Sequence, residues 1–524
     1  MMSKRSIHRI NHGIGYTFYV TFVVYLILSL ITIFQKTSEL RAGGIILNIL
    51  SLVLEILGPI YMIYFLVQLI DGFLKLGEIS YTTDKLTEQN KVSVVIPIHN
   101  VPIPVFEETL MGLSKQTYKN YDVWVGDDTP NIDLQKKYED LCKKYGFNYF
   151  YAENKKLKAG MLNLVIPRTN GDYVTFFDVD HVPSEDILAK FVAILEQYPE
   201  YEFVQAKYGF RNATSVLHVW SAMTTSQIFC SQNARRTFGA VLFQGASACF
   251  RRSGVQHIPE NVIIEDYSHS ISLMTQKKQG YFLDEFASQT LLPSTLDHQM
   301  SQLYRWIKGQ TGSFIAHLKD MFQGKLSFRQ SIDLFFTSTI IFGVTSFYEL
   351  GIVYGLMYLF KTPYYRALGL NSLSQIIIPI LIIIIYGGTF AIMIIYFIRS
   401  KFLKLKAWHV PFYVIFGGLA SPYLKLAALD GLFSTLLRVK KVDWNKKLNL
   451  VSWGTFFSLL GLVFFGFTAV STLDLLGIIQ YYGDNFYFAI FLAIGFALTF
   501  VLPFIVITRQ MFKPVEFGES NIFH

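Results

Sequence analysis

The stretch Tyr173–Pro183, which reads YVTFFDVDHVP, decides the fold class of this 524-residue chain. Its first five residues form a mostly apolar run without alternation, a pattern typical of a strand buried on both faces. This predicted strand, Tyr173–Phe177, runs directly into Asp178 and Asp180, which are separated by one residue. Ligands of open α/β sheets bind beyond the carboxyl ends of the strands. The stretch therefore predicts both a sheet and a polar site at its edge.

The same plan occurs upstream. Val92–Ile98 is a continuous apolar run, and a second predicted strand, Tyr121–Gly126, ends at Asp127 and Asp128. Helical patterns separate these strands, and another helix is expected to begin near Pro183. Such alternation predicts a doubly wound parallel sheet covered by helices on both faces.

The composition predicts that much of the chain lies in lipid. It is 52% hydrophobic and only 16% charged, with a mean hydropathy of +0.35, whereas residues 90–325 have the mixed composition of a soluble domain. A bilayer span needs roughly 20 apolar residues, which predicts six transmembrane helices. The runs are Tyr16–Phe34, Ile45–Ile70, Leu334–Phe360, Ile376–Ile398, Leu450–Leu473 and Phe486–Ile507.

Basic residues set the predicted orientation. Lys4, Arg5 and Arg9 precede the first run, and a second basic cluster follows the fourth. The positive-inside rule then places both termini and the soluble domain in the cytoplasm of a multi-pass cell-membrane protein. The stretch His409–Leu437 has basic clusters on both sides and is interrupted by two glycines and Pro422. This pattern favours an amphipathic or re-entrant segment at the cytoplasmic interface.

The charge distribution and the cysteine spacing argue against a nucleic-acid-binding protein and against a cysteine zinc site. The net charge is +8, but many of the Lys and Arg residues flank apolar runs, so we expect no nucleic-acid partner. The cysteines are Cys142, Cys230 and Cys249. None is at a C-x-x-C spacing or grouped with histidines as a zinc site requires, which predicts structural thiols.

Two carboxylates on a turn after a buried strand can hold a hard divalent cation together with a diphosphate. Oxygen ligands suit Mg²⁺ or Mn²⁺, so Asp178 and Asp180 are the predicted metal ligands. Aspartates also end strands as ordinary turn formers. Either acidic pair alone leaves both interpretations open.

Two more motifs follow downstream. An apolar run beginning at Val262 ends in Glu265 and Asp266, and a helical segment contains Gln302, Leu303, Tyr304, Arg305 and Trp306. Residues three and four apart share one face of a helix, so this segment can present an amide, a cation and an indole together. Arginine can neutralise phosphate oxygens and an aromatic ring can stack on a sugar. Taken singly, an arginine beside an aromatic residue more often packs at an interface.

In their order along the chain, these motifs resemble the D, DxD, ED and QxxRW series of membrane-bound family-2 glycosyltransferases, the cellulose synthase and hyaluronan synthase group. The resemblance extends to Lys158-Ala159-Gly160 with Asn163, and to Gln244-Gly245-Ala246-Ser247 followed by Phe250-Arg251-Arg252. Each motif is weak alone, but together they span the soluble domain.

The resemblance implies a GT-A (Rossmann-like) α/β cytoplasmic domain inserted in a multi-span α-helical membrane domain with interfacial helices. The expected parts are a transmembrane hairpin at 1–75, the glycosyltransferase domain at 90–298, interfacial helices with QxxRW at 299–333, a hairpin at 334–398, an interfacial segment with a gating loop at 407–448, a last hairpin at 449–508 and a cytoplasmic tail at 509–524.

The resemblance also implies roles for individual residues. The nucleotide sugar would contact Pro97, His99, Asn100, Asp127, Asp128, Lys158 and Asp178, and Mg²⁺ or Mn²⁺ would be held by Asp178 and Asp180. Asp266 would be the general base of an inverting transfer, with Glu265 and Arg305 completing the catalytic set. The acceptor would lie against Gln302, Trp306, Gln244 and Gly245.

The sequence departs from the family pattern at two places. Ile263 and Ile264 precede the acidic pair where Thr is frequent, and the expected gating loop, Val442–Lys447, lacks the family's Thr. Fewer than about 20 residues follow the last predicted span, which predicts no appended regulatory domain.

The leading hypothesis is a processive synthase that polymerises a UDP-sugar into a β-linked polysaccharide and secretes it across the lipid bilayer, with accessory secretion subunits as potential partners. The small residues Gly245, Ala246 and Ser247 favour UDP-glucose as the donor. One alternative is a non-processive enzyme that transfers one sugar to a lipid acceptor. Another is a transporter or receptor with a degenerate nucleotide-binding domain.

Overall fold

The strands predicted from continuous apolar runs form the centre of the molecule. The computed structural model describes residues 3–153, 157–213, 216–260, 262–365, 387–389, 391–399, 409–437 and 473. Over these residues, eight strands form one sheet in the order β3-β2-β1-β4-β7-β6-β8-β5. Their bounds are β1 Val92–Ile98, β2 Tyr121–Asp127, β3 Asn148–Tyr151, β4 Tyr173–Phe176, β5 Val182–Pro183, β6 Tyr201–Phe210, β7 Ala248–Arg251 and β8 Gln279–Thr290.

The sheet is covered by helices on both faces, as predicted. The covering helices are α3 Ile103–Ser114, α4 Ile132–Tyr145 and α6 Ile187–Gln197 on one face, and α5 Leu157–Val165, α7 Val216–Arg235 and α8 Glu265–Thr275 on the other. In β1, Val94 and Ile96 belong to the apolar cluster on the face covered by α3, which we call the first cluster. Val95 belongs to the cluster on the face covered by α5, which we call the second cluster. Because successive side chains of a strand point to opposite faces, a strand buried on both faces has no polar alternation.

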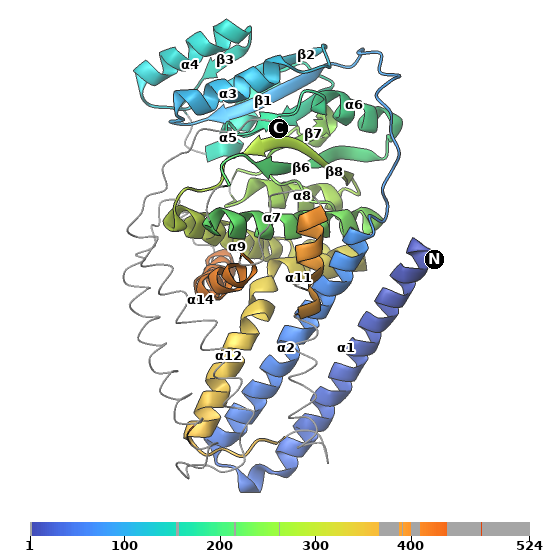
Figure 1. Ribbon diagram of the computed structural model, residues 1–524, viewed down its shortest axis with the longest axis vertical. Helices are drawn as coiled ribbons and strands as arrows, with labels where there is room; N and C mark the ends of the chain where they lie inside the picture. Colours follow the sequence, from blue (N-terminus) through green and yellow to red (C-terminus); the bar gives the residue numbers. More distant parts are fainter. Residues whose placement is uncertain are drawn as a thin grey trace.

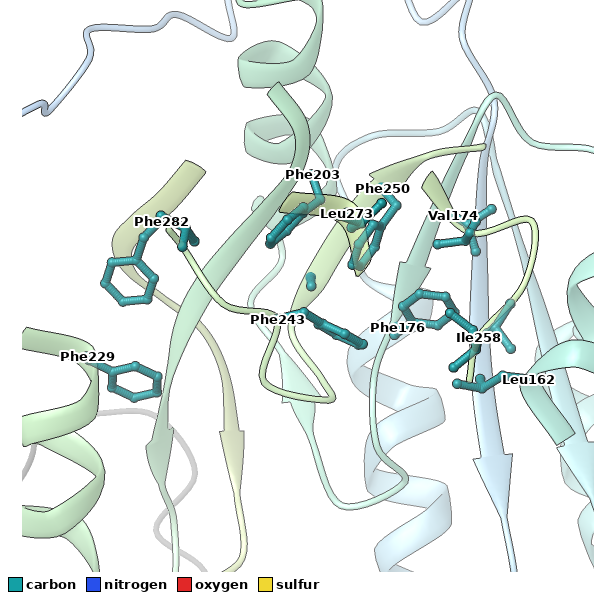
Figure 2. Packing of buried hydrophobic residues seen from close by; sticks show 14 of the residues in the cluster. Leu162, Val174, Phe176, Phe203, Phe229, Phe243, Phe250, Ile258, Leu273 and Phe282 are labelled. Atoms are coloured by element: carbon teal, nitrogen blue, oxygen red, sulfur yellow. The ribbon is translucent and has the colours of Figure 1, made fainter. Parts of the chain in front are cut away.

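Aromatic rings fill the second cluster (Figure 2). The Phe203 ring stacks on Phe250 at a centroid distance of 4.8 Å, and Phe243 meets Phe250 edge-on at 5.0 Å. Phe176 lies at 5.6 Å from the same ring. Strands β4, β6 and β7 and the loop before β7 therefore share one aromatic core.

The prediction of a parallel sheet is correct for only part of it. β3, β2, β1 and β4 are parallel, but β7 is antiparallel to both β4 and β6. Between β6 and β7 the chain passes through helix α7 Val216–Arg235 and then a turn in which Gly245 (φ +83°) and Ser247 (φ +54°) have left-handed backbone conformations. Because β7 runs opposite to both of its neighbours, the sheet is mixed.

Two long helices precede the sheet domain. α1 Lys4–Gln35 and α2 Ala42–Phe73 are the helices, among the described residues, that are both long and apolar enough to cross a bilayer. They project away from the sheet alongside α12 Ile340–Leu359 (Figure 1). Buried Glu55 of α2 accepts hydrogen bonds from the hydroxyls of Tyr25 on α1 and Tyr354 on α12. Such polar contacts between helices are typical of bundles in lipid.

The other predicted spans are described only in part. The run Leu334–Phe360 is divided at Thr339 between α11 Phe328–Ser338 and α12. Most of Ile376–Ile398, all of Leu450–Leu473 except Leu473, and Phe486–Ile507 lie outside the described residues, as do the expected gating loop and the tail. A six-span arrangement thus remains a prediction.

The segment predicted to be amphipathic or re-entrant is one continuous helix, α14 His409–Leu436, and its place at the cytoplasmic interface stays a prediction. It packs against α9 Leu296–Ala316, which a short helix, α10 Leu318–Phe322, follows. Gly431 of α14 lies so close to α9 that an added Cβ would be 2.3 Å from the Lys308 carbonyl oxygen. The two glycines and Pro422 thus lie within a helix, although isolated glycine and proline residues usually disfavour one.

Candidate active site

A cavity of about 300 Å³ lies where the carboxyl ends of β4 and β8 approach α7, α8 and α9. Ten of the residues predicted for the site line it, namely Lys158, Asp178, Asp180, Gln244, Gly245, Glu265, Asp266, Gln302, Arg305 and Trp306. Motifs separated by up to 148 positions in the sequence, from Lys158 to Trp306, therefore meet in one place.

Asp178 and Lys158 form an ion pair at the cavity wall. The Lys158 ammonium donates to Asp178 Oδ1 at 2.5 Å and to the Gly245 carbonyl oxygen at 2.8 Å. Withdrawal from bulk water would raise the pKa of the Asp178 carboxyl, but the charges of Lys158, His181 and Arg305 lower it. The Asp178 side chain is 38% exposed, so this carboxylate is ionised and accessible to a ligand.

Asp180 is oriented by the end of β8. Its Oδ2 accepts hydrogen bonds from the Thr290 hydroxyl at 2.5 Å and from the Leu291 backbone N–H at 3.2 Å. Arg211 donates to its backbone carbonyl at 3.2 Å. These contacts fix the second carboxylate of the DVD motif against the wall formed by β8.

Glu265 and Asp266 begin helix α8. Ile264, just before them, packs so closely against Gly309 of α9 that an added Cβ there would lie 2.6 Å from Ile264 Cγ1. Asp266 Oδ1 accepts from the Tyr267 N–H at 2.7 Å. Burial, together with the neighbouring Glu265 carboxylate, raises the pKa of Asp266 to about 7. A carboxyl with such a pKa is suited to exchange a proton near neutrality.

The turn at Gly245 touches both charged groups. A Cβ on Gly245 would lie 3.1 Å from Asp266 Oδ2 and 3.4 Å from Lys158 Nζ. While these two side chains stay where they are, a residue larger than glycine does not fit at this position. Together with the contact between Lys158 and Asp178, this brings the DVD motif, Lys158 and Asp266 close to the same glycine turn.

Helix α9 supplies the cavity wall that carries Gln302, Arg305 and Trp306. Burial lowers the pKa of Arg305, while the charges of Glu265, Asp266 and Asp178 act to raise it, so this cation lies within the field of all three carboxylates. The far side of α9 is held by α14, because Asp430 accepts from Tyr304 at 2.7 Å and pairs with Lys308 at 2.8 Å.

Five of the residues predicted to contact the nucleotide sugar are not among those lining this cavity, namely Pro97, His99, Asn100, Asp127 and Asp128. Pro97, His99 and Asn100 end β1, and Asp127 ends β2 in register with Ile98. Both oxygens of the fully buried Asp127 are engaged, by the Thr129 N–H at 2.8 Å and the Tyr149 hydroxyl at 2.6 Å.

The neighbouring Asp128 retains 13% exposure and bonds to His99 at 2.8 Å. Because β1 also pairs with β4, this pair lies along the same sheet edge as Asp178.

Other lining residues were not predicted. They include Tyr208, Ser221, Thr224, Thr225 and Gln299. Ser221 Oγ, Gln299 Oε1 and Gln244 Oε1 are buried and make no hydrogen bond with any residue that the structure describes. Buried polar atoms are nearly always satisfied, so these atoms are free for a polar ligand. Ser221, Thr224 and Thr225 have the i, i+3, i+4 spacing of one helix face, a signal present in the sequence.

Comparison with known proteins identifies the domain. Residues 93–258 match the glycosyl transferase family 2 model. The chain is 24% identical over 235 residues to the UDP-forming cellulose synthase catalytic subunit of Pseudomonas fluorescens. This aligned region covers 43% of this chain and 31% of that protein. It is 36% identical over 109 residues to the amylovoran biosynthesis glycosyltransferase AmsB of Erwinia amylovora, and this aligned region covers 20% of this chain and 36% of that protein. The chain thus spans about a third of the length of these relatives.

Among solved structures, the mannosyltransferase PcManGT from Pyrobaculum calidifontis, in complex with GDP-Man and Mn²⁺, has a TM-score of 0.49 and 14% identity. The likeness covers 68% of this chain and 97% of that one. The family match and the sheet described above together define a GT-A fold with a Rossmann-like parallel half.

Proposed function

From the premise that the chain is a family-2 glycosyltransferase of the cellulose synthase group, we propose that it is a processive, inverting synthase that polymerises a UDP-sugar into a β-linked polysaccharide. The observation that carries this proposal is the cavity itself, which unites four carboxylates with a lysine, an arginine and an indole. The acidic residues are Asp178, Asp180, Glu265 and Asp266.

The donor set of the cavity fits a divalent cation. Four carboxylates face two cationic side chains, Lys158 and Arg305, which leaves an excess of negative charge. Oxygen-rich acidic sites select Mg²⁺ or Mn²⁺, and we assign Asp178 and Asp180 as the residues that would hold the ion. When bound, such a cation neutralises charge on the diphosphate of a nucleotide sugar.

Asp266 is the proposed general base. The acceptor hydroxyl oxygen bonds to the anomeric carbon of the donor while the bond from that carbon to the diphosphate oxygen breaks. The hydroxyl proton passes to the Asp266 carboxylate, and the nucleoside diphosphate leaves with the bonding electrons. Attack opposite the leaving group inverts the anomeric centre. Because Tyr267 and Gly245 hold Asp266 in place, the carboxylate is positioned before the acceptor arrives.

Arg305 and Lys158 are the proposed stabilisers of the leaving group. Both are cationic, both line the cavity, and each lies in the field of Asp178 and Asp266. Fixed charges in a cavity shielded from water stabilise developing negative charge without reorganisation. Glu265 would keep Arg305 protonated and would make the Asp266 carboxylate more basic, since its charge raises the pKa of both groups.

The acceptor is proposed to be a sugar. Trp306 offers an aromatic surface, and the free oxygens of Ser221, Gln244 and Gln299 can accept hydrogen bonds from sugar hydroxyls. Gln302 completes this wall. An apolar lipid alone would leave those buried oxygens unsatisfied, at a cost of about 1–3 kcal/mol each.

The nucleotide is proposed to extend from Asp178 along the sheet edge to the β1 and β2 ends. There Asp128, His99, Asn100 and Pro97 would contact the base, with buried Asp127 shaping the loop. The apolar helices α1 and α2 would anchor the domain in the cell membrane, and the polymer would leave across it.

The test is product analysis with the purified full-length protein in detergent. Each common UDP-sugar, starting with UDP-glucose, is incubated with Mg²⁺ or Mn²⁺, and products are sized by mass spectrometry and digested with linkage-specific glycosidases. A ladder of β-linked products supports the proposal. Addition of one sugar to a co-purified lipid would replace it with the non-processive alternative, and no transfer from any donor would remove it.

A further inference from the structure

A second group of ligand-type side chains lies outside the catalytic cavity, where α1 meets the end of α2. His8 Nδ1 is 3.0 Å from Asp71 Oδ1, and His12 Nε2 is 2.7 Å from Asp71 Oδ2. The three ligand atoms all lie within 4.8 Å of one another. None of these residues has a role in the proposed sugar transfer.

The arrangement is built by helix geometry. His8 and His12 are four residues apart on α1, so their rings lie one above the other on one face, with centroids 4.3 Å apart. This is the spacing at which paired helical histidines bind zinc. Both rings are about one-quarter exposed, at 28% and 25%, whereas the Asp71 side chain is 2% exposed. An ion can therefore reach the two imidazoles while the carboxylate is held in the protein.

Asn11 orients the carboxylate from the same helix. Its side-chain amide donates to Asp71 Oδ1 at 3.2 Å and to the Val67 carbonyl oxygen at 3.0 Å. Outer contacts of this kind fix metal ligands and are part of a working metal site.

We propose that His8, His12 and Asp71 bind one transition-metal ion of the Zn²⁺ class. Two imidazole nitrogens and one carboxylate oxygen are a ligand set that zinc uses and that Mg²⁺ does not prefer. Zinc–ligand bonds of about 2.0–2.2 Å at tetrahedral angles put ligand atoms roughly 3.3–3.5 Å apart. The observed nitrogen–oxygen distances of 3.0 and 2.7 Å are shorter than this and involve the two different oxygens of Asp71, so the histidine and aspartate side chains must rotate apart by roughly 0.3–0.8 Å to admit the ion.

The fourth coordination position has room for water. His12 and Asp71 also line a cavity of about 500 Å³ between α1, α2 and α11. Imidazole and carboxylate ligands bind a metal ion only when they are deprotonated, so affinity for the ion rises with pH.

The ion would fasten α1 to the helix that supports the catalytic cavity. Gly72, next to Asp71, packs against α7 so tightly that an added Cβ would be 1.9 Å from the Cys230 carbonyl oxygen. The same α7 carries Ser221 into the cavity. The site thus links the first membrane helix to the acceptor wall through α2.

Zinc binding by the full-length protein tests the proposal. The protein is purified in detergent without a polyhistidine tag, stripped with a chelator, loaded with Zn²⁺ and desalted, and its metal content is measured by mass spectrometry. We expect one equivalent in the wild type and in two controls, His257→Gln, at an exposed histidine of the catalytic domain, and Asp178→Asn. The equivalent should be lost in His12→Gln, and Asn11→Ala should weaken binding roughly 10–100-fold.

Two measurements on the wild type, one spectroscopic and one thermal, do not require the His12→Gln variant to fold. Co²⁺ added to the stripped wild type should give the strong visible absorption of a tetrahedral site, and Zn²⁺ should raise the melting temperature. Equal zinc content in the wild type and His12→Gln would overturn the proposal. So would loss of the zinc in Asp178→Asn, or a wild type without the tetrahedral Co²⁺ spectrum.

Discussion

Gly245→Ala tests whether Asp266 and Lys158 are held at fixed positions. The substitution has two effects, which the structure separates. An alanine at φ +83° is in the left-handed region, which costs roughly 1–2 kcal/mol of stability. Its Cβ would also lie 3.1 Å from Asp266 Oδ2, closer than the ordinary contact distance of 3.4–4 Å. The carboxylate must then move by a few tenths of an ångström.

Gly146→Ala is the matched control. Gly146 ends α4 at φ +72°, and nothing lies within 4 Å of an added Cβ there. Both variants should lose a similar amount of thermal stability, since both place alanine in the left-handed region. Displacing a catalytic group by about 1 Å costs on the order of 100-fold in rate, so a shift of about 0.3 Å, from 3.1 to 3.4 Å, should lower kcat in Gly245→Ala roughly 4-fold.

The assay is initial-rate release of UDP by each purified variant, with melting temperature measured in parallel. Gly146→Ala should turn over at the wild-type rate. If kcat of Gly245→Ala falls within about twofold of Gly146→Ala, Asp266 is not the group whose position limits the reaction.

Three further predictions concern the same framework. Because Asp266 has a raised pKa of about 7 and must be ionised to accept a proton, kcat/KM should increase as pH rises through about 7; a flat profile from pH 6 to 8 would contradict its role as base. Gly309→Ala places a Cβ 2.6 Å from Ile264 Cγ1, so it should destabilise the protein by about 1–3 kcal/mol, measured by thermal unfolding; an unchanged melting temperature would show that α9 can move away from α8 freely. Arg235→Met leaves the fully buried Asp333 carboxylate without its cation, which should cost roughly 3–5 kcal/mol; restoration of stability in Arg235→Met with Asp333→Asn would identify the pair as the cause, and no restoration would reject it.

The strands and their acidic ends could be predicted because a strand buried on both faces is a continuous apolar run, which is easily recognised in a sequence. Val92–Ile98 has no polar alternation since helices cover both faces of β1. The antiparallel direction of β7 could not be predicted, because a four-residue strand after a glycine turn has no periodicity that indicates direction.

The site residues that could be predicted most directly are the acidic residues at the ends of strands and helices. Asp178, Asp180, Glu265 and Asp266 follow or begin regular elements, and the fold brings such positions together. The sequence could not distinguish the two adjacent aspartates after β2, because which of them points inward depends on Tyr149 and Thr129. Ser221 and Gln299 were missed because their helices look like ordinary packing helices until their faces are known.

Replacement of the proposed base gives the most direct test of the proposed chemistry. Asp266→Asn keeps the size of the side chain and removes its ability to accept the acceptor proton. With the donor that the wild type uses, we predict a fall in turnover of at least about 100-fold, with donor affinity retained within a few fold. Turnover within a few fold of the wild type would contradict the assignment of this cavity as the active site.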